Sequence, residues 1–279
     1  MLEHNYSVLM SVYENDKPTF LSQAIQSMVD QTVAFHDMVL VCDGPIPESL
    51  NAEIAYWETV LGARLNVVRL AKNGGLGKAL QEGLRYCVCE VVARMDSDDI
   101  SRPDRCEKLL VAMQDGKLDL VGGAIEEFIE VPGDSGSVRA LPLAYDGIVK
   151  YSKTRNPFNH MSVMFHKEIV EAVGGYKPFH LMEDYYLWVR MLMGECRVAN
   201  IPDVVVDVRV GDGMFERRSN REYLVDQRAF FGQLLKMGYI SRGQYAKTMA
   251  ARTVVTYLPA KSVARVYSTF LRKGGQDAK

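Results

Sequence analysis

The chain has 279 residues, 48% of them hydrophobic and 24% charged, and its net charge at pH 7 is −2. This composition is that of an ordinary globular protein, long enough for one large α/β domain or for a domain with an appendage. No stretch approaches the ~20 apolar residues of a membrane span, and the N-terminus lacks the basic and apolar regions of a signal peptide, so we expect a cytoplasmic protein.

Charge is distributed unevenly along the chain. Residues 209–279 contain 14 Lys and Arg against 5 Asp and Glu, so this segment carries +9 and the remaining 208 residues carry −11. The asymmetry predicts an acidic catalytic body with a basic tail that faces an anionic partner such as phosphate or lipid headgroups. No zinc-finger, helix-turn-helix or aromatic RNP pattern supports nucleic acid as that partner.

The cysteines are odd in number and irregularly spaced: Cys42, Cys87, Cys89, Cys106 and Cys196. The close pair Cys87 and Cys89 lacks the two-residue spacer and the second half of a zinc site. We therefore expect reduced, mostly buried thiols, as is usual in the cytoplasm.

The first hundred residues alternate between predicted strands and helices. A near-continuous apolar run at 6–13 predicts a strand buried on both faces, and Pro18 opens a helix with apolar residues at helical spacing. Further strands are expected at 38–42, 65–70 and 90–95, and further helices near 48–60 and at 77–86. Strands that alternate with helices imply right-handed crossovers and a parallel sheet.

The remainder of the chain is less regular. Residues 131–137 are rich in Gly and Ser and predict a loop or hairpin tip between two short strands. A helix is expected directly after Glu183 and Asp184. From about residue 210 the pattern is helical, with a break at Pro259.

The most informative segment is 94–103. Three carboxylates follow the strand expected at 90–95: Asp96, Asp98 and Asp99. They therefore lie at the carboxyl end of a strand, where open α/β sheets bind their ligands. Crowded carboxylates repel unless a cation lies among them, and Mg²⁺ or Mn²⁺ commonly shares carboxylate oxygens with a substrate diphosphate. A helix is expected to follow, with Ser101 as a candidate cap and Pro103 at a first-turn position. The alternative for the three acids is a solvated acidic turn that caps this helix.

A glycine-rich loop at 72–78 opens the third helix. It is not a Walker A loop, because Ala79 stands where Ser or Thr is needed. It is not the dinucleotide fingerprint either, because Leu80 stands where the third glycine belongs. As a turn into a helix it still lets a ligand approach the backbone closely.

Taken together, these segments resemble family 2 of the glycosyltransferases, nucleotide-sugar enzymes with a GT-A fold. Five segments match in order: 7–13 as the opening strand, 41–44 as the second-strand acidic motif, 73–79 as the Asn/Gly stretch, 95–99 as the metal-binding motif, and 174–190 as the acceptor-side segment. The resemblance covers roughly residues 5–215 and is greatest to bacterial enzymes that build capsule, exopolysaccharide and O-antigen repeat units.

The resemblance implies an α/β architecture of two parts. Residues 1–215 would form the GT-A catalytic domain, with a mostly parallel nucleotide-binding sheet flanked by helices at about 1–100. The acceptor-binding half would follow at about 101–215, and 216–279 would form a basic helical extension.

The resemblance also implies a nucleotide site at the ends of the first strands. Asp43 would hydrogen-bond the base, normally uracil, and a plain turn residue is its alternative reading. The other nucleotide-binding positions would be Val12, Tyr13, Glu14, Asn73, Gly74, Asp96 and Arg209.

Metal binding is assigned by the same resemblance to the acidic segment. Asp98 would coordinate Mn²⁺ or Mg²⁺ and bridge it to the diphosphate, Asp96 would contact ribose or the metal shell, and Asp99 would share the task. Arg94 is equally a salt-bridge partner for these acids or a nucleotide contact. Some family members place a histidine ligand near Arg209, but no histidine follows His180 here, so a third metal ligand from the protein is not expected.

For catalysis the resemblance assigns Asp184 as general base, with Glu183 orienting the acceptor. Transfer with inversion needs a base to take the proton of the attacking hydroxyl, and a metal neutralises charge on the departing diphosphate. The alternative is a helix-start carboxylate pair favoured by the helix dipole. His160 either lines the donor-sugar or acceptor pocket or has a structural role.

The predicted function is transfer of a sugar from a UDP-sugar to a saccharide or a polyprenyl-diphosphate-linked saccharide. The basic helices either attach to the anionic inner face of the membrane or pack on the catalytic domain. One alternative is a sugar-phosphate nucleotidyltransferase, whose N-terminal glycine-rich loop is missing from residues 11–18. The other is a catalytically silent nucleotide-sugar-binding protein, against which Asp96, Asp98 and Asp184 argue.

Overall fold

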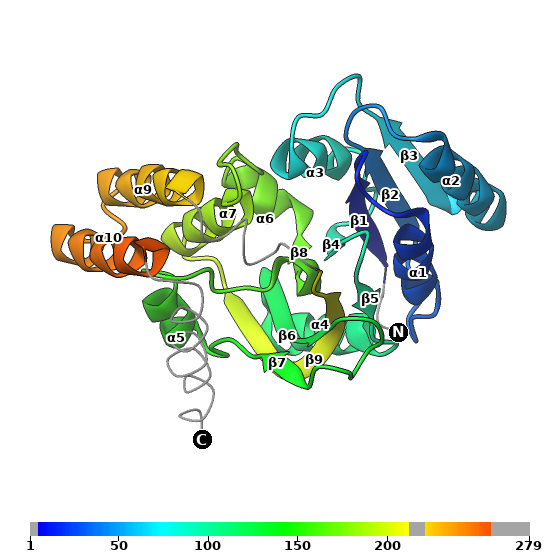
Figure 1. The fold of residues 1–279 in the computed structure, drawn as a ribbon. Coiled ribbons are helices and arrows are strands. Elements are labelled where there is room, and N and C mark those ends of the chain that lie inside the picture. The colour runs from blue at the N-terminus through cyan, green and yellow to red at the C-terminus, as the bar shows by residue number, and fades with distance from the viewer. Residues whose placement is uncertain (1–4, 212–220, 258–279) are drawn as a thin grey trace.

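The computed structural model describes residues 5–211 and 221–257, in which helices cover a curved sheet (Figure 1). Within these residues the sheet has nine strands in the order β3-β2-β1-β4-β8-β6-β9-β5, with β7 paired to β6. The strands are β1 (Tyr6–Val12), β2 (Asp37–Cys42), β3 (Leu65–Arg69), β4 (Val91–Met95), β5 (Ile100–Ser101), β6 (Leu120–Phe128), β7 (Ser137–Arg139), β8 (Met164–His166) and β9 (Val198–Arg209). The helices are α1 (Pro18–Val29), α2 (Glu48–Leu61), α3 (Leu76–Leu84), α4 (Arg105–Gly116), α5 (Tyr145–Tyr151), α6 (Lys167–Ala172), α7 (Glu183–Met193), α9 (Arg221–Lys236) and α10 (Arg242–Tyr257), with 3₁₀ turns at Gly62–Arg64 and His160–Ser162.

The first hundred residues form the predicted parallel sheet. β1 pairs in parallel with β2 and β4, and β2 pairs in parallel with β3. The predicted strands and helices of this half are confirmed, with differences of one or two residues at their ends. Because these strands run in one direction, their carboxyl ends meet at the same edge of the sheet.

The second half adds strands of mixed direction. β8 is antiparallel to both β4 and β6, while β9 runs parallel to β6. β6 and β7 form the hairpin predicted around residues 131–137. The short strand β5 pairs with β9 through Ile100 and Asp207, so the end of β9 lies beside the acidic segment.

The predicted start of α4 is wrong. Ser101 belongs to β5 and its hydroxyl accepts a hydrogen bond from Gln31, so it is not the helix cap. The N-cap is Asp104, and Pro103 precedes the helix instead of lying in its first turn. The reason is tertiary: pairing with β9, and a hydrogen bond that the N–H of Ser101 donates to the hydroxyl of Ser27 in α1, hold the segment extended.

Two hydrophobic clusters lie on opposite faces of the sheet. Leu9 of β1 packs with residues of α3, α7 and α9, whereas its neighbours Val8 and Met10 pack with residues of α1, α2 and α4. Alternate strand residues point to opposite faces, so the near-continuous apolar run of β1 serves both clusters. All five cysteines are free and buried, as predicted.

The C-terminal helices pack on the rest of the protein. Phe230, Phe231 and Leu234 of α9 are fully buried in the same cluster as α7, and α9 and α10 lie beside α7 in Figure 1. Among the described residues, no helix combines the length and the apolar character that crossing a bilayer would require. The expected boundary at 215 and the break at Pro259 lie outside the described residues, so this division into domains stays a prediction.

Candidate active site

The acid cluster consists of Asp96, Asp98 and Asp99, which directly follow β4. One carboxylate oxygen of each residue lies within 4.8 Å of the others. Asp99 is 2% exposed and accepts a hydrogen bond from the backbone N–H of Arg209 at 2.9 Å. An all-oxygen set of this kind fits a hard divalent cation such as Mg²⁺ or Mn²⁺.

The electrostatics of the cluster also fit a cation. Burial and the neighbouring charges of Asp96 and Asp16 raise the pKa of Asp98 to about 6. Burial together with Asp96 and Asp98 raises the pKa of Asp99 well above its ordinary value. A divalent ion among these groups would offset both the desolvation and the repulsion that cause these shifts.

A fourth carboxylate, Asp16, lies near the cluster and is not singled out by any sequence pattern. It accepts hydrogen bonds from the backbone N–H of Tyr13 and from the hydroxyl of Ser97, each at 3.0 Å. Burial raises its pKa to about 6. The loop after β1 is thereby tied to the acidic segment, and the only local signal for this was an Asp in the turn before Pro18.

Arg94 is a buried cation between two groups of carboxylates. It is 1% exposed and forms an ion pair with Asp96, which confirms the predicted salt bridge. Its Nε and Nη1 atoms have no hydrogen-bond partner among the described residues. Burial raises the pKa of the surrounding carboxyl groups and the charge of Arg94 opposes that rise at Asp98, Asp99, Glu183 and Asp184.

Arg209, at the end of β9, lies against the acid cluster as expected for a nucleotide contact. Its Nε donates to the carbonyl of Asp98 at 3.1 Å, and its guanidinium lies 3.9 Å from the ring centroid of Phe20. These contacts hold the cation at the carboxyl edge of the sheet, where it can reach a phosphate.

Asp43 organises the glycine-rich loop. Its carboxylate accepts hydrogen bonds from the backbone N–H groups of Gly74 and Gly75, at 2.7 and 2.9 Å. Gly44 has φ +90°, and a Cβ there would lie 2.5 Å from the backbone nitrogen of Asn73, so this turn requires glycine. Asp43, Asn73 and Gly74 are therefore brought together, and a role of Asp43 in binding the base stays a prediction.

The first loop lies at the same edge of the sheet. The carbonyl of Val12 accepts a hydrogen bond from the N–H of Asp43, whereas Tyr13 and Glu14 are exposed in the turn that follows β1. Their backbone is accessible to a ligand, and their contact with a nucleotide stays a prediction.

Glu183 and Asp184 occupy the first turn of α7. Burial and the charge of Asp184 raise the pKa of Glu183 to about 7. Burial also raises the pKa of Asp184, although hydrogen bonds from Asn156 and from the backbone of Tyr185 oppose the rise. The side chain of Glu183 packs against Gly77 at the start of α3, where a Cβ would lie 2.9 Å from it.

Asn156 is a site residue that sequence patterns did not identify. Its Nδ2 atom donates to Asp184 at 2.5 Å and its Oδ1 atom accepts from the N–H of Phe158, which fixes the orientation of the amide. Only its position four residues before His160 placed it near the predicted site.

His160 is buried away from solvent. Its Nε2 atom pairs with the hydroxyl of Tyr176 at 2.9 Å, and its ring packs edge-on against Trp188. Burial and the nearby charge of Arg94 lower its pKa well below the ordinary value, so the ring is neutral. These contacts suit the structural alternative, and a contact with sugar stays a prediction.

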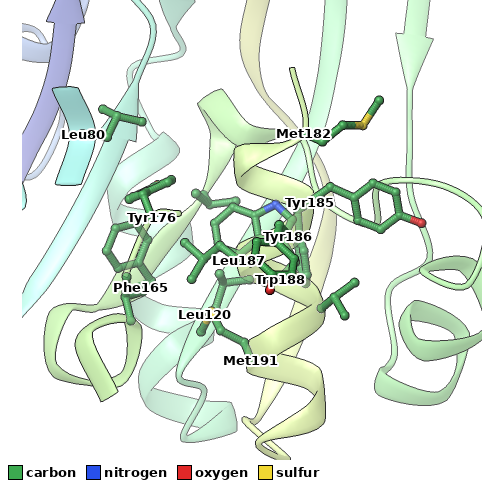
Figure 2. Packing of buried hydrophobic residues seen from close by; sticks show 14 of the residues in the cluster. Leu80, Leu120, Phe165, Tyr176, Met182, Tyr185, Tyr186, Leu187, Trp188 and Met191 are labelled. Carbon is green, nitrogen blue, oxygen red and sulfur yellow. The ribbon is translucent and has the colours of Figure 1, made fainter. Parts of the chain in front are cut away.

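The carboxylate pair is held by a helix that is buried around most of its circumference. Figure 2 shows Trp188 and Leu187 of α7 inside the cluster, with Phe165 and Tyr176 to one side. Both Leu187 and Trp188 are fully buried. Close packing on several sides fixes the direction in which the first turn of α7 presents its carboxylates.

Known proteins resemble the chain in sequence and in fold. A model of the family described as "Glycosyl transferase family 2" matches residues 7–174. An Escherichia coli protein named UDP-Gal:alpha-D-GlcNAc-diphosphoundecaprenol beta-1,3-galactosyltransferase is 36% identical over 269 residues, which cover 96% of this chain and 97% of the relative. The amylovoran biosynthesis glycosyltransferase AmsE of Erwinia amylovora is 38% identical over 265 residues, which cover 94% and 97% of the two chains.

A solved structure supports the fold. The mannosyltransferase PcManGT from Pyrobaculum calidifontis, in complex with GDP-Man and Mn²⁺, superposes with a TM-score of 0.62 at 18% identity, covering 96% of this chain and 80% of that one. The predicted GT-A fold is thus confirmed. The family model spans more than half of the chain and both relatives align over nearly their whole length, so the protein belongs to glycosyl transferase family 2 and is a glycosyltransferase.

Proposed function

We propose that this glycosyltransferase moves a sugar from a UDP-sugar to a polyprenyl-diphosphate-linked saccharide, with inversion, in the biosynthesis of a surface polysaccharide. The main support for this proposal is that Arg209 is hydrogen-bonded to the acid cluster at the carboxyl edge of the parallel sheet. Support for the lipid-linked acceptor comes from the Escherichia coli relative, whose name specifies a diphosphoundecaprenol substrate.

The acid cluster would hold Mn²⁺ or Mg²⁺ through Asp98 and Asp99, with Asp96 contacting ribose or the metal shell. The bound ion would neutralise charge on the departing diphosphate. Arg209 would contact the same diphosphate, because a guanidinium matches phosphate oxygens. The loop held by Asp43 would receive the nucleotide, with the backbone of Asn73 and Gly74 close to it.

In the acceptor half, Asp184 would act as the general base. Its carboxylate is oriented by Asn156 and by the N–H of Tyr185, and Arg94 lies within electrostatic reach. Such a base would take the proton of the acceptor hydroxyl as its oxygen attacks the anomeric carbon, which gives inversion in one step. Glu183 would orient the acceptor. His160 would stabilise this wall of the site by packing against Tyr176 and Trp188.

We propose UDP, not GDP, as the nucleotide of the donor. The relative that is 36% identical is named for a UDP-sugar, whereas the solved structure with GDP-Man is only 18% identical. We place the reaction at the cytoplasmic face of the membrane, because a polyprenyl acceptor is anchored there. The basic extension would add weak attachment to anionic lipid headgroups.

Isothermal titration calorimetry with UDP, with Mn²⁺ or with EDTA, tests the metal and the nucleotide together. We expect tight binding of UDP only with Mn²⁺, weaker binding of GDP, and loss of the Mn²⁺ effect in Asp98→Asn. Asp115→Asn, an exposed change in α4, is the matched control and should behave as the unaltered protein. Equal UDP affinity with EDTA and with Mn²⁺ would remove the proposed role of the metal.

A further inference from the structure

A second group of ligand-type side chains lies at the opposite end of the parallel sheet. His36 directly precedes β2, Asp37 is its first residue, and Cys89 lies just before β4. One ligand atom of each residue lies within 4.8 Å of the other two. The acid cluster follows the carboxyl end of β4, so a strand length of about 16–23 Å separates it from this second group.

Asp37 is the centre of this group. It is 8% exposed, and its Oδ1 atom accepts hydrogen bonds from the hydroxyl of Ser7 at 2.6 Å and from the thiol of Cys89 at 3.7 Å. Its Oδ2 atom is buried and has no hydrogen-bond partner among the described residues. A buried carboxylate oxygen without a partner is costly, so a cation or donor beside Oδ2 would stabilise the site.

Ser7 holds the group in place. Its hydroxyl donates to Asp37 and accepts from the backbone N–H of Cys89 at 3.0 Å. The segment before β4 is thereby fixed against the start of β2 across the intervening strand β1. Hydrogen bonds of this kind orient the ligands of metal sites.

We propose that His36, Asp37 and Cys89 form a binding site for a thiophilic divalent cation of the Zn²⁺ type, separate from the catalytic metal site. Imidazole nitrogen, thiolate sulfur and carboxylate oxygen are the donors that Zn²⁺ prefers, and three protein ligands leave a fourth position for water. The acid cluster, in contrast, contains oxygen donors only, which suit Mg²⁺ or Mn²⁺.

An ion can reach this site from solvent. His36 is exposed, and Cys89 lines a small surface cavity of about 140 Å³ together with Glu90 and Lys167. Binding through sulfur requires the thiolate, so the Cys89 thiol would release its proton to solvent when the ion binds. The bound ion would connect β2 to the segment before β4 and would give the unpaired oxygen of Asp37 a partner.

The sequence does not reveal this site, because its ligands are far apart in the chain. Cys87 and Cys89 lack the spacing of a zinc motif, and His36 and Asp37 precede them by about fifty residues. Pairing of β2 and β4 with opposite sides of β1 brings the ligands together.

Cobalt spectroscopy on the full chain tests the proposal. The protein would be stripped of metal, kept reduced with a phosphine under nitrogen, and titrated with Co²⁺. We expect a thiolate-to-cobalt charge-transfer band that saturates at one equivalent and disappears when Zn²⁺ displaces the Co²⁺. Co²⁺ in the acid cluster gives no such band, because no sulfur ligand is present there.

Three variants identify the residues that bind the Co²⁺ responsible for this band. Cys89→Ala should abolish it, and His36→Ala should weaken Co²⁺ binding by at least about tenfold. Cys196→Ala is the matched control, because this buried thiol lies outside the group, and it should keep the band. UDP binding and circular dichroism would verify that each variant is folded.

Several results would overturn the proposal: no band in the unaltered protein, a band that survives Cys89→Ala, or Co²⁺ affinity unchanged in His36→Ala. The last variant keeps the test decisive even if Cys89→Ala does not fold, because His36 is exposed and its replacement leaves the core intact.

Discussion

At the scale of single residues, Asp184 combines the properties required of a general base. One carboxylate oxygen accepts from Asn156 and the other from the N–H of Tyr185, so its direction is fixed. Burial raises its pKa toward the range in which a carboxylate accepts protons more readily. Glu183, one residue earlier, packs against Gly77 of α3 and is suited to contact the acceptor instead.

Asp184→Asn should retain affinity for the donor and lose transfer by roughly 10²–10⁴-fold, which is the usual contribution of a general base. Donor affinity would be measured by calorimetry and transfer with a lipid-linked acceptor. Glu183→Gln is the neighbouring control and should reduce transfer less. Near-normal transfer by Asp184→Asn would place the base elsewhere.

Asn156→Ala should move the acidic limb of the pH–rate profile to higher pH. The amide of Asn156 stabilises the charged form of Asp184 and so lowers its pKa, while burial raises it. Without the amide, one contribution that lowers the pKa of Asp184 is lost, so this pKa rises. Asp184 then becomes protonated, and activity is lost, at a higher pH as the solution is acidified. Loss of activity should therefore be greatest in acid and partly recovered in alkali.

Thr154→Ala, an exposed change in the same loop, is the control for Asn156→Ala and should leave the profile in place. An acidic limb at the same pH in Asn156→Ala and in the unaltered protein would show that Asn156 does not act through Asp184.

At the scale of elements, Gly83 allows α3 to lie close to the sheet. A Cβ at this position would lie 2.5 Å from Cγ2 of Val41 and 2.7 Å from Cδ1 of Leu9. Both partners are fully buried in β2 and β1, and valine has little rotamer freedom. This close approach helps to place the glycine-rich loop and Gly77 beside the active site.

Gly83→Ala should lower the free energy of unfolding by about 1–2 kcal/mol, because overpacking typically costs about 1–3 kcal/mol and outweighs the gain in helix propensity. Urea denaturation would measure the change. Gly232→Ala in α9 is the matched control, since a Cβ there meets nothing within 4 Å. It should be neutral or stabilising by up to about 1 kcal/mol, and equal effects of the two changes would contradict the packing argument.

At the scale of the whole molecule, the described C-terminal helices are part of the packed structure. Phe230 and Phe231 join the cluster around α7, and Arg252 of α10 donates to the carbonyl of Thr154 and lies over the ring of Phe231. Residues 221–257 therefore pack on the rest of the protein, and the choice between simple packing and membrane attachment stays a prediction. Attachment to a membrane would depend on basic residues that remain exposed and on residues 258–279, which lie outside the described part of the chain.

In liposome flotation we expect the protein to rise with anionic vesicles at low salt and not with neutral vesicles. Residues 260–279 contain five Lys and Arg, each worth about 1 kcal/mol near an anionic surface. High salt and deletion of residues 260–279 should both reduce flotation. Deletion without any effect at low salt would show that this segment does not bind the membrane.

The resemblance to family 2 glycosyltransferases supplied the GT-A fold, whereas the residues themselves determined the order of strands and helices in the first half and the parallel sheet. These follow from local signals, namely apolar periodicity, the Pro that opens α1 and the glycine turns. The sequence also located the acid cluster, whose carboxylates directly follow a predicted strand, and the resemblance singled out the pair Glu183 and Asp184. The sequence pattern failed at Ser101, where pairing with β9 overrode the local helix-start signal.

Only the tertiary structure decided which distant residues share a site. Arg209 lies 110 residues from Asp99 in sequence but is hydrogen-bonded to it, and Asn156 reaches Asp184 across 28 residues. The group of His36, Asp37 and Cys89 likewise exists only because β1 aligns β2 with β4. Contacts of this kind depend on strand pairing and helix packing, and the pKa values depend on burial, so neither is encoded in the spacing of residues along the chain.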